Sequence, residues 1–413
     1  MARKFGTHDL YRGPMISRVK RARHGADPRK RDLAPAVLDF GPVRFVLARH
    51  FGFCYGVENA IEIAYETLAT HPGTRVFFLS EMIHNPKVNG DLKDRGVRFM
   101  FTPAGEQLVP WEELGGDDIV VVPAFGTTLE MQEKLAERGI DAYTYNTTCP
   151  FVEKVWKRSA ELGSKGYTVV VHGKATHEET RATFSHSVRG APTVVVLDTS
   201  EAEVLAGVIR DERDAEEFER TFGNKCSQGF DPQRNLRRIG VVNQTTMLAT
   251  ETREIARLLR RALADRYGDE NIGEHFADTS DTLCYATNEN QNATYALIEH
   301  GADLALVVGG YNSSNTSHIV ELCEKAIATY FIKGKEEVLS ADVIRHFSLH
   351  DRGISTTTGW LPDRRPVDIV LTCGASCPDA MLDDVLLRVL SFFEHTKPID
   401  QVLEPHLRPA TDD

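Results

Sequence analysis

The chain of 413 residues is long enough for two to four domains with ordinary cores. Its 41% hydrophobic and 26% charged residues are typical of a folded soluble protein, and no stretch approaches the roughly 18 to 20 apolar residues that a membrane span needs. The net charge is −12, and residues 1–42 hold ten Lys and Arg against four Asp and Glu, so the rest carries about −18. This balance excludes nucleic acid as an expected partner.

The basic segment 1–42 comes first along the chain and allows two interpretations. A plastid or mitochondrial transit peptide would be rich in Arg and Ser and poor in acids, but Ser17 is the only serine and three aspartates interrupt the positive charge, Asp9, Asp27 and Asp32. We therefore favour a solvated extension that packs loosely on the body. Seven scattered cysteines, an odd number without a secretory signal, indicate a reducing compartment, so we expect a cytoplasmic protein rather than one imported into a plastid.

Three of the cysteines, Cys54, Cys149 and Cys284, stand at the start of segments with the periodicity of an amphipathic helix. A short apolar strand follows each segment, at residues 76–79, 169–171 and 304–308. The loop after each strand lies at nearly the same distance from its cysteine, because His84, His177 and Asn312 follow by 30, 28 and 28 residues. This spacing indicates an internal repeat.

The second half of each repeat is also similar. It contains a strand, at residues 119–122, 239–242 or 369–371, that runs into a polar loop. Six loops therefore lie at the carboxyl ends of strands, where open α/β sheets bind ligands. The pattern predicts an α/β fold of three similar lobes, at residues 43–148, 149–283 and 284–390, of which the first begins with the strand at 43–48. Residues 210–236 are expected to form a surface insertion with a helical segment, and residues 391–413 a C-terminal tail.

One cysteine from each of three similar lobes can meet the other two near a pseudo-threefold axis. A soft metal or an iron–sulfur cluster there would accept three thiolates and keep one site open. A structural zinc site, closed by His84 or His177, is the alternative. A diphosphate-binding or phosphoryl-transfer module without redox chemistry is a third class, but the chain has no Walker-type lysine loop to support it.

The polar loops contain groups suited to phosphate and to proton transfer. Residues 310–317 offer short hydroxyl and amide donors and backbone N–H groups before a helix, which suits phosphate oxygens, although a helix-capping cluster would look the same. The loop around Ser376 is similar, and His84 and His177 can add hydrogen bonds. The segment His177-Glu178-Glu179 supplies the only obvious acid in these loops, and its Glu179 could pass a proton through the hydroxyl of Thr245.

Eight motifs in order, from about residue 43 to 390, resemble the 4-hydroxy-3-methylbut-2-enyl diphosphate reductase family (LytB), the last enzyme of the methylerythritol phosphate route to isoprenoids. They are Gly52-Phe53-Cys54-Tyr55-Gly56-Val57, Ile83-His84-Asn85-Pro86, Thr148-Cys149-Pro150, His172-Gly173-Lys174 with His177-Glu178-Glu179, Gln244-Thr245-Thr246, Cys284-Tyr285-Ala286-Thr287, Asn312-Ser313-Ser314-Asn315 and Gly374-Ala375-Ser376. The chain is most similar to the plant and cyanobacterial branch, because of Ala124-Phe125-Gly126, the insertion ending in Gly229-Phe230-Asp231-Pro232 and the N-terminal extension.

This resemblance implies three α/β lobes around a central 4Fe–4S cluster with three cysteine ligands, Cys54, Cys149 and Cys284, and a fourth iron open to the substrate. It implies a two-electron reductive dehydroxylation that yields isopentenyl or dimethylallyl diphosphate and water, with a small ferredoxin or flavodoxin as electron donor. Glu179 would supply a proton through Thr245. The diphosphate and the rest of the substrate would be bound by His84, His177, Gln244, Thr245, Asn312, Ser313, Ser314, Asn315 and Ser376.

One position departs from the commoner bacterial branch of that family. Phe125 occupies the place of a histidine that contacts the diphosphate, and a phenyl ring has no hydrogen-bonding group. Thr127 and Thr128 are nearby candidates to replace the lost contact. We expect the remaining cysteines, Cys226, Cys323, Cys373 and Cys377, not to be ligands of the metal.

Overall fold

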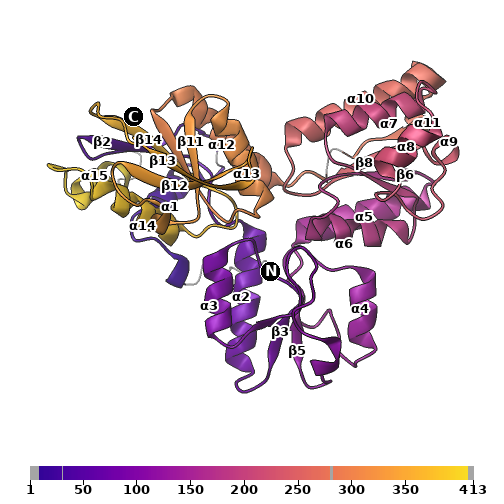
Figure 1. Ribbon diagram of the computed structural model, residues 1–413, viewed down its shortest axis with the longest axis horizontal. Coiled ribbons are helices and arrows are strands. Elements are labelled where there is room, and N and C mark those ends of the chain that lie inside the picture. Colours follow the sequence, from indigo (N-terminus) through magenta and orange to yellow (C-terminus); the bar gives the residue numbers. More distant parts are fainter. Residues whose placement is uncertain (1–8, 30, 280–281, 408–413) are drawn as a thin grey trace. The chain divides into compact units, whose positions relative to one another are not determined.

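The computed structural model describes residues 9–29, 31–279 and 282–407. Two compact units share these residues (Figure 1). Unit 1 comprises residues up to Glu58, His84–Val88 and Tyr285 onward, and unit 2 comprises Asn59–Ile83 and Asn89–Cys284. No helix within the described residues is long and apolar enough to cross a membrane.

Unit 1 is built on a seven-stranded sheet in the order β1-β2-β14-β10-β11-β12-β13. The strands β2, β14, β10 and β11 are parallel, and β1, β12 and β13 add antiparallel edges. The strand bounds are β1 (Ala36–Asp39), β2 (Val43–Leu47), β10 (Leu304–Val308), β11 (Ala328–Ile332), β12 (Val343–Ser348), β13 (Gly353–Thr358) and β14 (Val367–Cys373).

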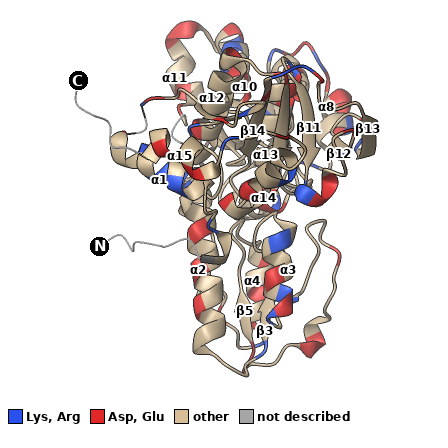
Figure 2. Cartoon of the chain, turned by 90° about the vertical axis from the view of Figure 1, so that its left-hand side faces the viewer, with Lys and Arg blue, Asp and Glu red and all other residues tan. Residues whose placement is uncertain are grey.

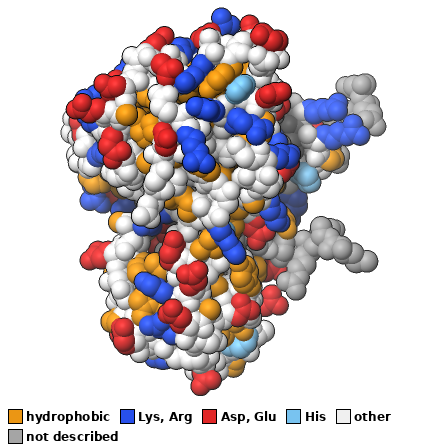
Figure 3. All heavy atoms as spheres, turned by 90° about the vertical axis from the view of Figure 1, so that its right-hand side faces the viewer, with side chains coloured by type: hydrophobic (Ala, Val, Ile, Leu, Met, Phe, Trp, Pro, Cys, Tyr) orange, Lys and Arg blue, Asp and Glu red, His pale blue; other side chains and the backbone are white. Residues whose placement is uncertain are grey.

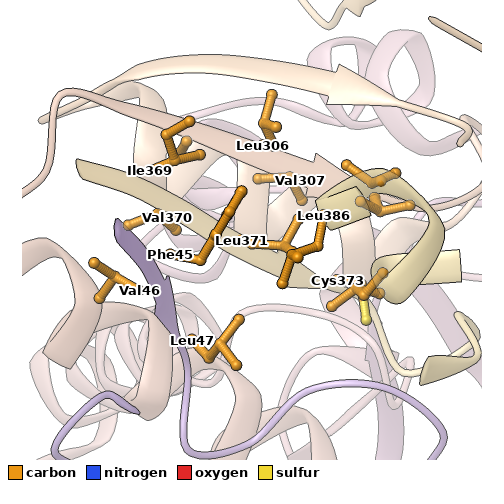
Figure 4. Close-up of a cluster of buried hydrophobic side chains, with 14 of the residues drawn as sticks. Phe45, Val46, Leu47, Leu306, Val307, Ile369, Val370, Leu371, Cys373 and Leu386 are labelled. Carbon is orange, nitrogen blue, oxygen red and sulfur yellow. The ribbon is translucent and has the colours of Figure 1, made fainter. Parts of the chain in front are cut away.

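The helices of unit 1 are η1 (Asp9–Tyr11), α1 (Ile16–Ala26), α12 (Tyr285–His300), α13 (Ser314–Glu324), η5 (Lys335–Glu337), α14 (Asp379–Leu390) and α15 (Ile399–Leu407). The central strands are continuous apolar runs because both faces are covered, and their side chains form one core with α14 (Figure 4). Phe45, Leu306 and Leu371 from three neighbouring strands are fully buried in it.

Unit 2 contains two smaller sheets. The first has the order β4-β3-β5, with β3 (Val76–Phe78), β4 (Arg98–Phe99) and β5 (Ile119–Val121) all parallel. Its helices are α4 (Leu129–Ala136) and η2 (Trp111–Glu113), together with α2 (Tyr55–Thr70) and α3 (Pro86–Asp94), which both begin in unit 1.

The second sheet of unit 2 has the order β7-β6-β8-β9, with β6 (Thr168–His172), β7 (Thr193–Val196), β8 (Ile239–Asn243) and β9 (Phe276–Ala277). Alternate residues of β6 enter different cores, because Val170 packs with α7 and α10 whereas Val169 and Val171 pack with α5. The helices are α5 (Pro150–Ser164), α6 (Glu178–Val188), α7 (Thr199–Ile209), α8 (Ala215–Phe222), α9 (Pro232–Asn235), α10 (Ala249–Tyr267), η3 (Asp269–Asn271) and α11 (Ile272–His275).

The internal repeat reappears as a common strand order. The strand after each cysteine-led helix is β3, β6 or β10, and it lies between the next strand (β4, β7 or β11) and the strand of the second half-unit (β5, β8 or β14). All six of these pairings are parallel. The predicted α/β fold with three similar lobes is thereby confirmed in the described part of the chain.

The strand before each cysteine pairs with a strand of one lobe, whereas the helix after that cysteine belongs to another lobe. Asn146, before Cys149, forms a parallel bridge with Val122 beside β5; β9, before Cys284, pairs with β8; and β2, before Cys54, pairs with β14. The strand at residues 43–48 therefore does not begin the sheet of the first lobe, where we expected it. It lies between β1 and β14 with every residue except Arg44 buried, and it completes the seven-stranded sheet.

The expectation of a loosely packed N-terminal extension is wrong. Tyr11, Ile16 and Val19 are at most 2% exposed, because η1 packs on α14 and α1 packs on α14 and α15. The carboxylate of Asp383 accepts hydrogen bonds from the backbone N–H groups of Met15 and Ile16, at 2.8 and 3.0 Å, where α1 begins. A carboxylate is favoured there by the helix dipole, although burial raises the pKa of Asp383 to about 6.

The Asp383→Ala variant is expected to lose about 2 to 4 kcal/mol of unfolding free energy, since two buried N–H groups lose their acceptor. Chemical denaturation monitored by circular dichroism measures this loss. The neighbouring Asp384→Ala is the matched control, because Asp384 is half exposed and only pairs with Lys335 at 3.3 Å. Equal stabilities for the two variants would contradict the assigned role.

The insertion at residues 210–236 contains the expected helical segment but is not confined to the surface. Phe218 and Phe222 of α8 are 2% and 0% exposed within the core of the second unit 2 sheet. The chain then runs along the edge strand β7, where Val195 N–H donates to Lys225 O and Ser227 N–H donates to Thr193 O, both at 2.8 Å. The insertion thus covers a sheet edge that would otherwise expose unpaired backbone groups.

Candidate functional site

The three repeat cysteines lie at the amino ends of helices. Cys54 precedes α2, Cys149 is the N-cap of α5 ahead of Pro150, and Cys284 precedes α12. All three are partly exposed, and none of the seven cysteines forms a disulfide. A helix amino end favours negative charge, so these positions suit thiolates that serve as metal ligands.

Each cysteine is tied to the carboxyl end of the strand beside it. Cys54 N–H donates to Ala375 O at 3.3 Å, in the loop after β14, and Cys149 N–H donates to Ala124 O at 3.0 Å, in the loop after β5. Before Cys284, the hydroxyl of Thr282 donates to Asn243 Oδ1 at 2.8 Å, at the end of β8. A strand end therefore holds each of the three turns, through the backbone N–H of Cys54 and Cys149 and through the side chain of Thr282 before Cys284.

The three thiols are divided between the two units. Cys54 belongs to unit 1, whereas Cys149 and Cys284 belong to unit 2. Among residues 9–29, 31–279 and 282–407, no three His, Cys, Asp or Glu side chains are close enough to hold a metal ion. Three partly exposed thiols at helix amino ends nevertheless fit an iron–sulfur cluster as a donor set.

In unit 1, the structure brings together four predicted substrate-binding residues, His84, Ser313, Asn315 and Ser376, which we call the hydroxyl cluster. Ser376 Oγ donates to the backbone oxygen of His84 at 3.2 Å and lies 3.4 Å from Ser313 Oγ. Asn315 Oδ1 accepts from Ala375 N–H at 2.8 Å. All four are at most 8% exposed. Gly310 is required beside them, because a Cβ atom there would lie 2.5 Å from His84 O.

The hydroxyl cluster has the features of an oxyanion site. It stands at the amino end of α13, where Ser313 is the N-cap and accepts from Thr316 N–H. The amide nitrogen Nδ2 of Asn315 is buried and has no hydrogen-bond partner within the described protein. A buried donor without an acceptor is costly, so this nitrogen favours a ligand oxygen beside the helix terminus.

In unit 2, a second set comprises His177, Glu179, Gln244 and Thr245, which we call the acid cluster. Glu179 is 1% exposed. Its Oε2 accepts from the Thr245 hydroxyl at 2.9 Å, and its Oε1 accepts from the Thr245 backbone N–H. Burial raises the pKa of Glu179 to about 7, although both hydrogen bonds from Thr245 act in the opposite direction. A carboxyl group with this pKa can hold and release a proton near neutrality.

His177 is held in one orientation by the start of α6. Its Nδ1 accepts from Glu179 N–H at 3.2 Å as the N-cap of that helix, so the neutral ring carries its proton on Nε2. Phe125 packs edge to face against this ring, with centroids 5.7 Å apart. Thr128 Oγ1 caps α4 by accepting from Met131 N–H. One of the two hydroxyls considered as a replacement for the missing histidine is therefore already used as a helix cap.

Both polar atoms of the Gln244 carboxamide form hydrogen bonds with neighbouring residues of the protein. Its Oε1 accepts from Thr180 Oγ1 at 2.9 Å and from Lys174 N–H at 3.1 Å, and its Nε2 donates to Thr246 Oγ1 at 2.6 Å. This residue therefore fastens the loop after β6 to the loop after β8. Asn312 precedes the N-cap Ser313, and Ser314 is the first residue of α13.

Two threonines in these bonds were not identified from the sequence. Thr180 binds Gln244, and Thr316 donates its hydroxyl to Ser313 Oγ at 2.9 Å. Each is fully buried one turn into its helix and supports the residue predicted to contact the ligand. Their position three residues after His177 and Ser313 is the signal that could have revealed them, since the first turn of a helix packs against its own N-cap.

Three lobes with parallel strands, each preceded by a cysteine at the start of a helix, define the class of protein as an α/β protein built from a repeated unit. The chain belongs to the LytB protein family, whose family model matches residues 45–390.

Two cyanobacterial relatives are both named 4-hydroxy-3-methylbut-2-enyl diphosphate reductase. The one from Synechococcus sp. is 40% identical, over 85% of this chain and 86% of the relative, and the one from Cyanothece sp. is 41% identical, over 85% of each. The solved structure of E-1-hydroxy-2-methyl-but-2-enyl-4-diphosphate reductase from Plasmodium falciparum aligns with a TM-score of 0.60 at 18% identity, covering 85% of this chain and 88% of that one. This likeness supports the fold.

Proposed function

We propose that the chain converts (E)-4-hydroxy-3-methylbut-2-enyl diphosphate, two electrons and two protons into isopentenyl or dimethylallyl diphosphate and water. This reductive removal of a hydroxyl group is the last step of the methylerythritol phosphate route. The observation that carries the proposal is the buried pair of Glu179 and Thr245, since the reaction needs a group that is protonated near neutral pH. The cyanobacterial relatives with this reductase name support it.

Cys54, Cys149 and Cys284 would hold a 4Fe–4S cluster. When bound, such a cluster supplies electrons and, at an iron without a protein ligand, a Lewis acid for the substrate hydroxyl. The other four cysteines fit this role less well. Cys323, Cys373 and Cys377 are fully buried in the unit 1 core, and Cys226 lies within the insertion.

The hydroxyl cluster and His177 would bind the diphosphate. Asn315 Nδ2 and His177 Nε2–H supply donors, and the amino end of α13 supplies favourable electrostatics for the negative charge. Asn312 and Ser314 of the same loop are included with the predicted contacts. Gln244 would position Thr245 through its bonds to Thr180 and Thr246.

The rate of turnover is expected to fall as pH rises through about 7, because Glu179 donates a proton only in its protonated form. Each pH unit above that midpoint lowers the protonated fraction by about tenfold. The hydroxyl of Thr245 lowers the pKa of Glu179, so Thr245→Val should move the midpoint to higher pH. Measuring kcat from pH 6 to 9 with a chemical reductant tests both statements, and a midpoint that stays in place in Thr245→Val would contradict the assignment.

The visible spectrum and the metal content after anaerobic purification test the proposed function itself. Absorption at about 400 nm with about four iron atoms per chain is the expected result. A colourless protein with one zinc would support the structural zinc alternative instead. A small ferredoxin or flavodoxin is the proposed electron donor, and a cytoplasmic location stays a prediction.

A further inference from the structure

The residue two places before each repeat cysteine lies in the turn that presents the thiol. In two of the three repeats it is a threonine, Thr147 or Thr282, and both are at most 3% exposed. Thr147 Oγ1 donates to Val122 O at 2.6 Å, just after β5. Thr282 Oγ1 donates to Asn243 Oδ1 at 2.8 Å, at the end of β8. A side-chain donor therefore ties each of these two turns to the end of the neighbouring strand.

In the first repeat the same position is Gly52, which has no side chain to form such a bond. Gly52 has a φ of +79°, a conformation that glycine adopts without strain. A Cβ atom there would lie 2.8 Å from Asp379 Oδ1 and 2.9 Å from Lys20 Nζ. Lys20 of α1 and Asp379 of α14 thus fill the space that a side chain at this position would need.

The ammonium group of Lys20 supplies the donor that the glycine lacks. Its Nζ donates to Phe51 O at 2.9 Å, the carbonyl directly before Gly52, and to Asp379 Oδ1 at 2.7 Å. Nζ also lies 4.8 Å from the centroid of the Phe51 ring, a cation–π contact. Phe51 is buried, and a hydrogen bond from a charged donor is stronger than one from a neutral hydroxyl. Lys20 therefore holds the turn before Cys54 firmly.

Asp379 fixes the Lys20 ammonium in turn. Its second carboxylate oxygen, Oδ2, accepts from Ser17 Oγ at 2.7 Å, and Asp379 is the first residue of α14, where a helix amino end favours negative charge. Its side chain is 13% exposed, in contrast to the acidic and basic side chains interspersed over the face in Figure 3. Water screens exposed ion pairs, whereas the loss of one partner from a largely buried pair is strongly unfavourable.

The turn that Lys20 holds leads directly to Cys54. Tyr11 packs edge to face on Phe53, with ring centroids 5.7 Å apart. The N-terminal segment, whose helix α1 carries basic residues along its length (Figure 2), therefore contacts each of the three residues that precede Cys54. The backbone N–H of Cys54 then donates to Ala375 O at 3.3 Å. The position of this cysteine depends on residues from both ends of the chain.

We propose that Lys20 is a positioning residue for Cys54: together with Asp379 it fixes the turn at residues 51–54 so that the thiol is held where it can bind iron. The proposal rests on the proposed function, in which Cys54 is a ligand of the cluster. It assigns to a residue outside the three lobes the task that a threonine performs in the other two repeats.

The test is the rate at which anaerobic holoenzyme releases iron to an excess of EDTA, followed by the loss of absorption at about 400 nm. Lys20→Met keeps the length of the side chain but removes its charge and its donors, so release should be about tenfold faster or more, as for other groups that orient a metal ligand. Lys20→Arg keeps the positive charge and N–H donors and should stay within about threefold of wild type.

Arg18→Met is the matched control. It removes the same charge from the same helix, but Arg18 is half exposed and pairs with the exposed Asp400 at 3.6 Å, so its release rate should stay within about twofold of wild type. Equal release rates in Lys20→Met and Arg18→Met would overturn the proposal. If Lys20→Met does not fold, Lys20→Gln replaces it with an expected acceleration of about threefold or more, and an unchanged rate in that variant would likewise overturn the proposal.

Electron paramagnetic resonance of the dithionite-reduced holoenzyme separates positioning from general stabilisation. A displaced cysteine ligand should shift or broaden the signal of Lys20→Met, whereas a folded protein of lower stability keeps the wild-type signal. An unchanged signal, with iron lost only in step with unfolding in urea, would assign the ion pair to fold stability and overturn the proposal. Wild-type protein that binds no iron would refute the proposed function instead, so the two failures are distinct.

Discussion

The Glu179→Gln variant is expected to lose about 10² to 10⁴ of its turnover rate while it retains iron and substrate affinity. Glutamine keeps the size of the side chain, its Oε1 can accept from the Thr245 backbone N–H and its Nε2 can donate to the Thr245 hydroxyl oxygen, but it has no proton to transfer at neutral pH. The decline of kcat above pH 7 should disappear in the residual activity, because the titrating group is gone. Steady-state kinetics with a chemical reductant and iron analysis of the same preparation measure the three quantities.

Glu178→Gln is the matched control for that variant. Glu178 is the adjacent acid in the same first turn of α6, and it is similarly buried at 8% exposure. It lies outside the acid cluster and lines a separate small cavity with Arg181. Its substitution should change kcat by less than about fivefold, since it removes no proposed proton donor. Near-normal turnover in Glu179→Gln would remove Glu179 from the proton path.

Replacement of any one repeat cysteine should abolish both the cluster and turnover. Cys149→Ser is the sharpest case, because Cys149 is the N-cap of α5 and serine is itself a good N-cap residue. The fold should persist while a soft ligand is exchanged for a hard one. Iron content, absorption at about 400 nm and turnover should fall together, and circular dichroism should not change.

Cys226→Ser is the control for the cysteine series. Cys226 is partly exposed like the three repeat cysteines, but it lies in the insertion, and burial raises the pKa of its thiol. Iron and turnover should stay at wild-type levels. If Cys149→Ser kept full iron and turnover while Cys226→Ser lost them, the ligand set would be wrong.

Local pattern was enough to predict the lobes and the helix starts. Apolar runs of strand length and the periodicity after Cys54, Cys149 and Cys284 correspond to β3, β6 and β10 and to α2, α5 and α12. The sheet to which β2 belongs could not be predicted in this way. Its partner in the sheet, β14, lies more than 300 residues away, and a continuous apolar strand carries no information about which sheet it joins.

Most of the predicted substrate-binding and catalytic residues fall into two sets, the hydroxyl cluster in unit 1 and the acid cluster in unit 2. Glu179 with Thr245, and Ser313 with Ser376, were predicted because they stand in polar loops after strands, and within each pair the side chains are hydrogen-bonded or in contact. The role of the N-terminal segment was missed. Its composition is polar and basic, and only the burial of Tyr11, Ile16 and Val19 against α14 and α15 shows that α1 is part of the folded body. Three apolar residues in a charged segment are too weak a signal for that inference.

The exchange of strands between lobes sets an order of events during synthesis. Arg44 of β2 pairs with Asp368 of β14, which is 324 residues further along the chain. At ordinary rates of translation, β2 waits on the order of tens of seconds for this partner. Ala375, the hydrogen-bond acceptor for the Cys54 backbone, is made later still. The thiol that is synthesised first is therefore fixed in place last, and a nascent or truncated chain that ends before β14 cannot present all three cysteines in their final turns.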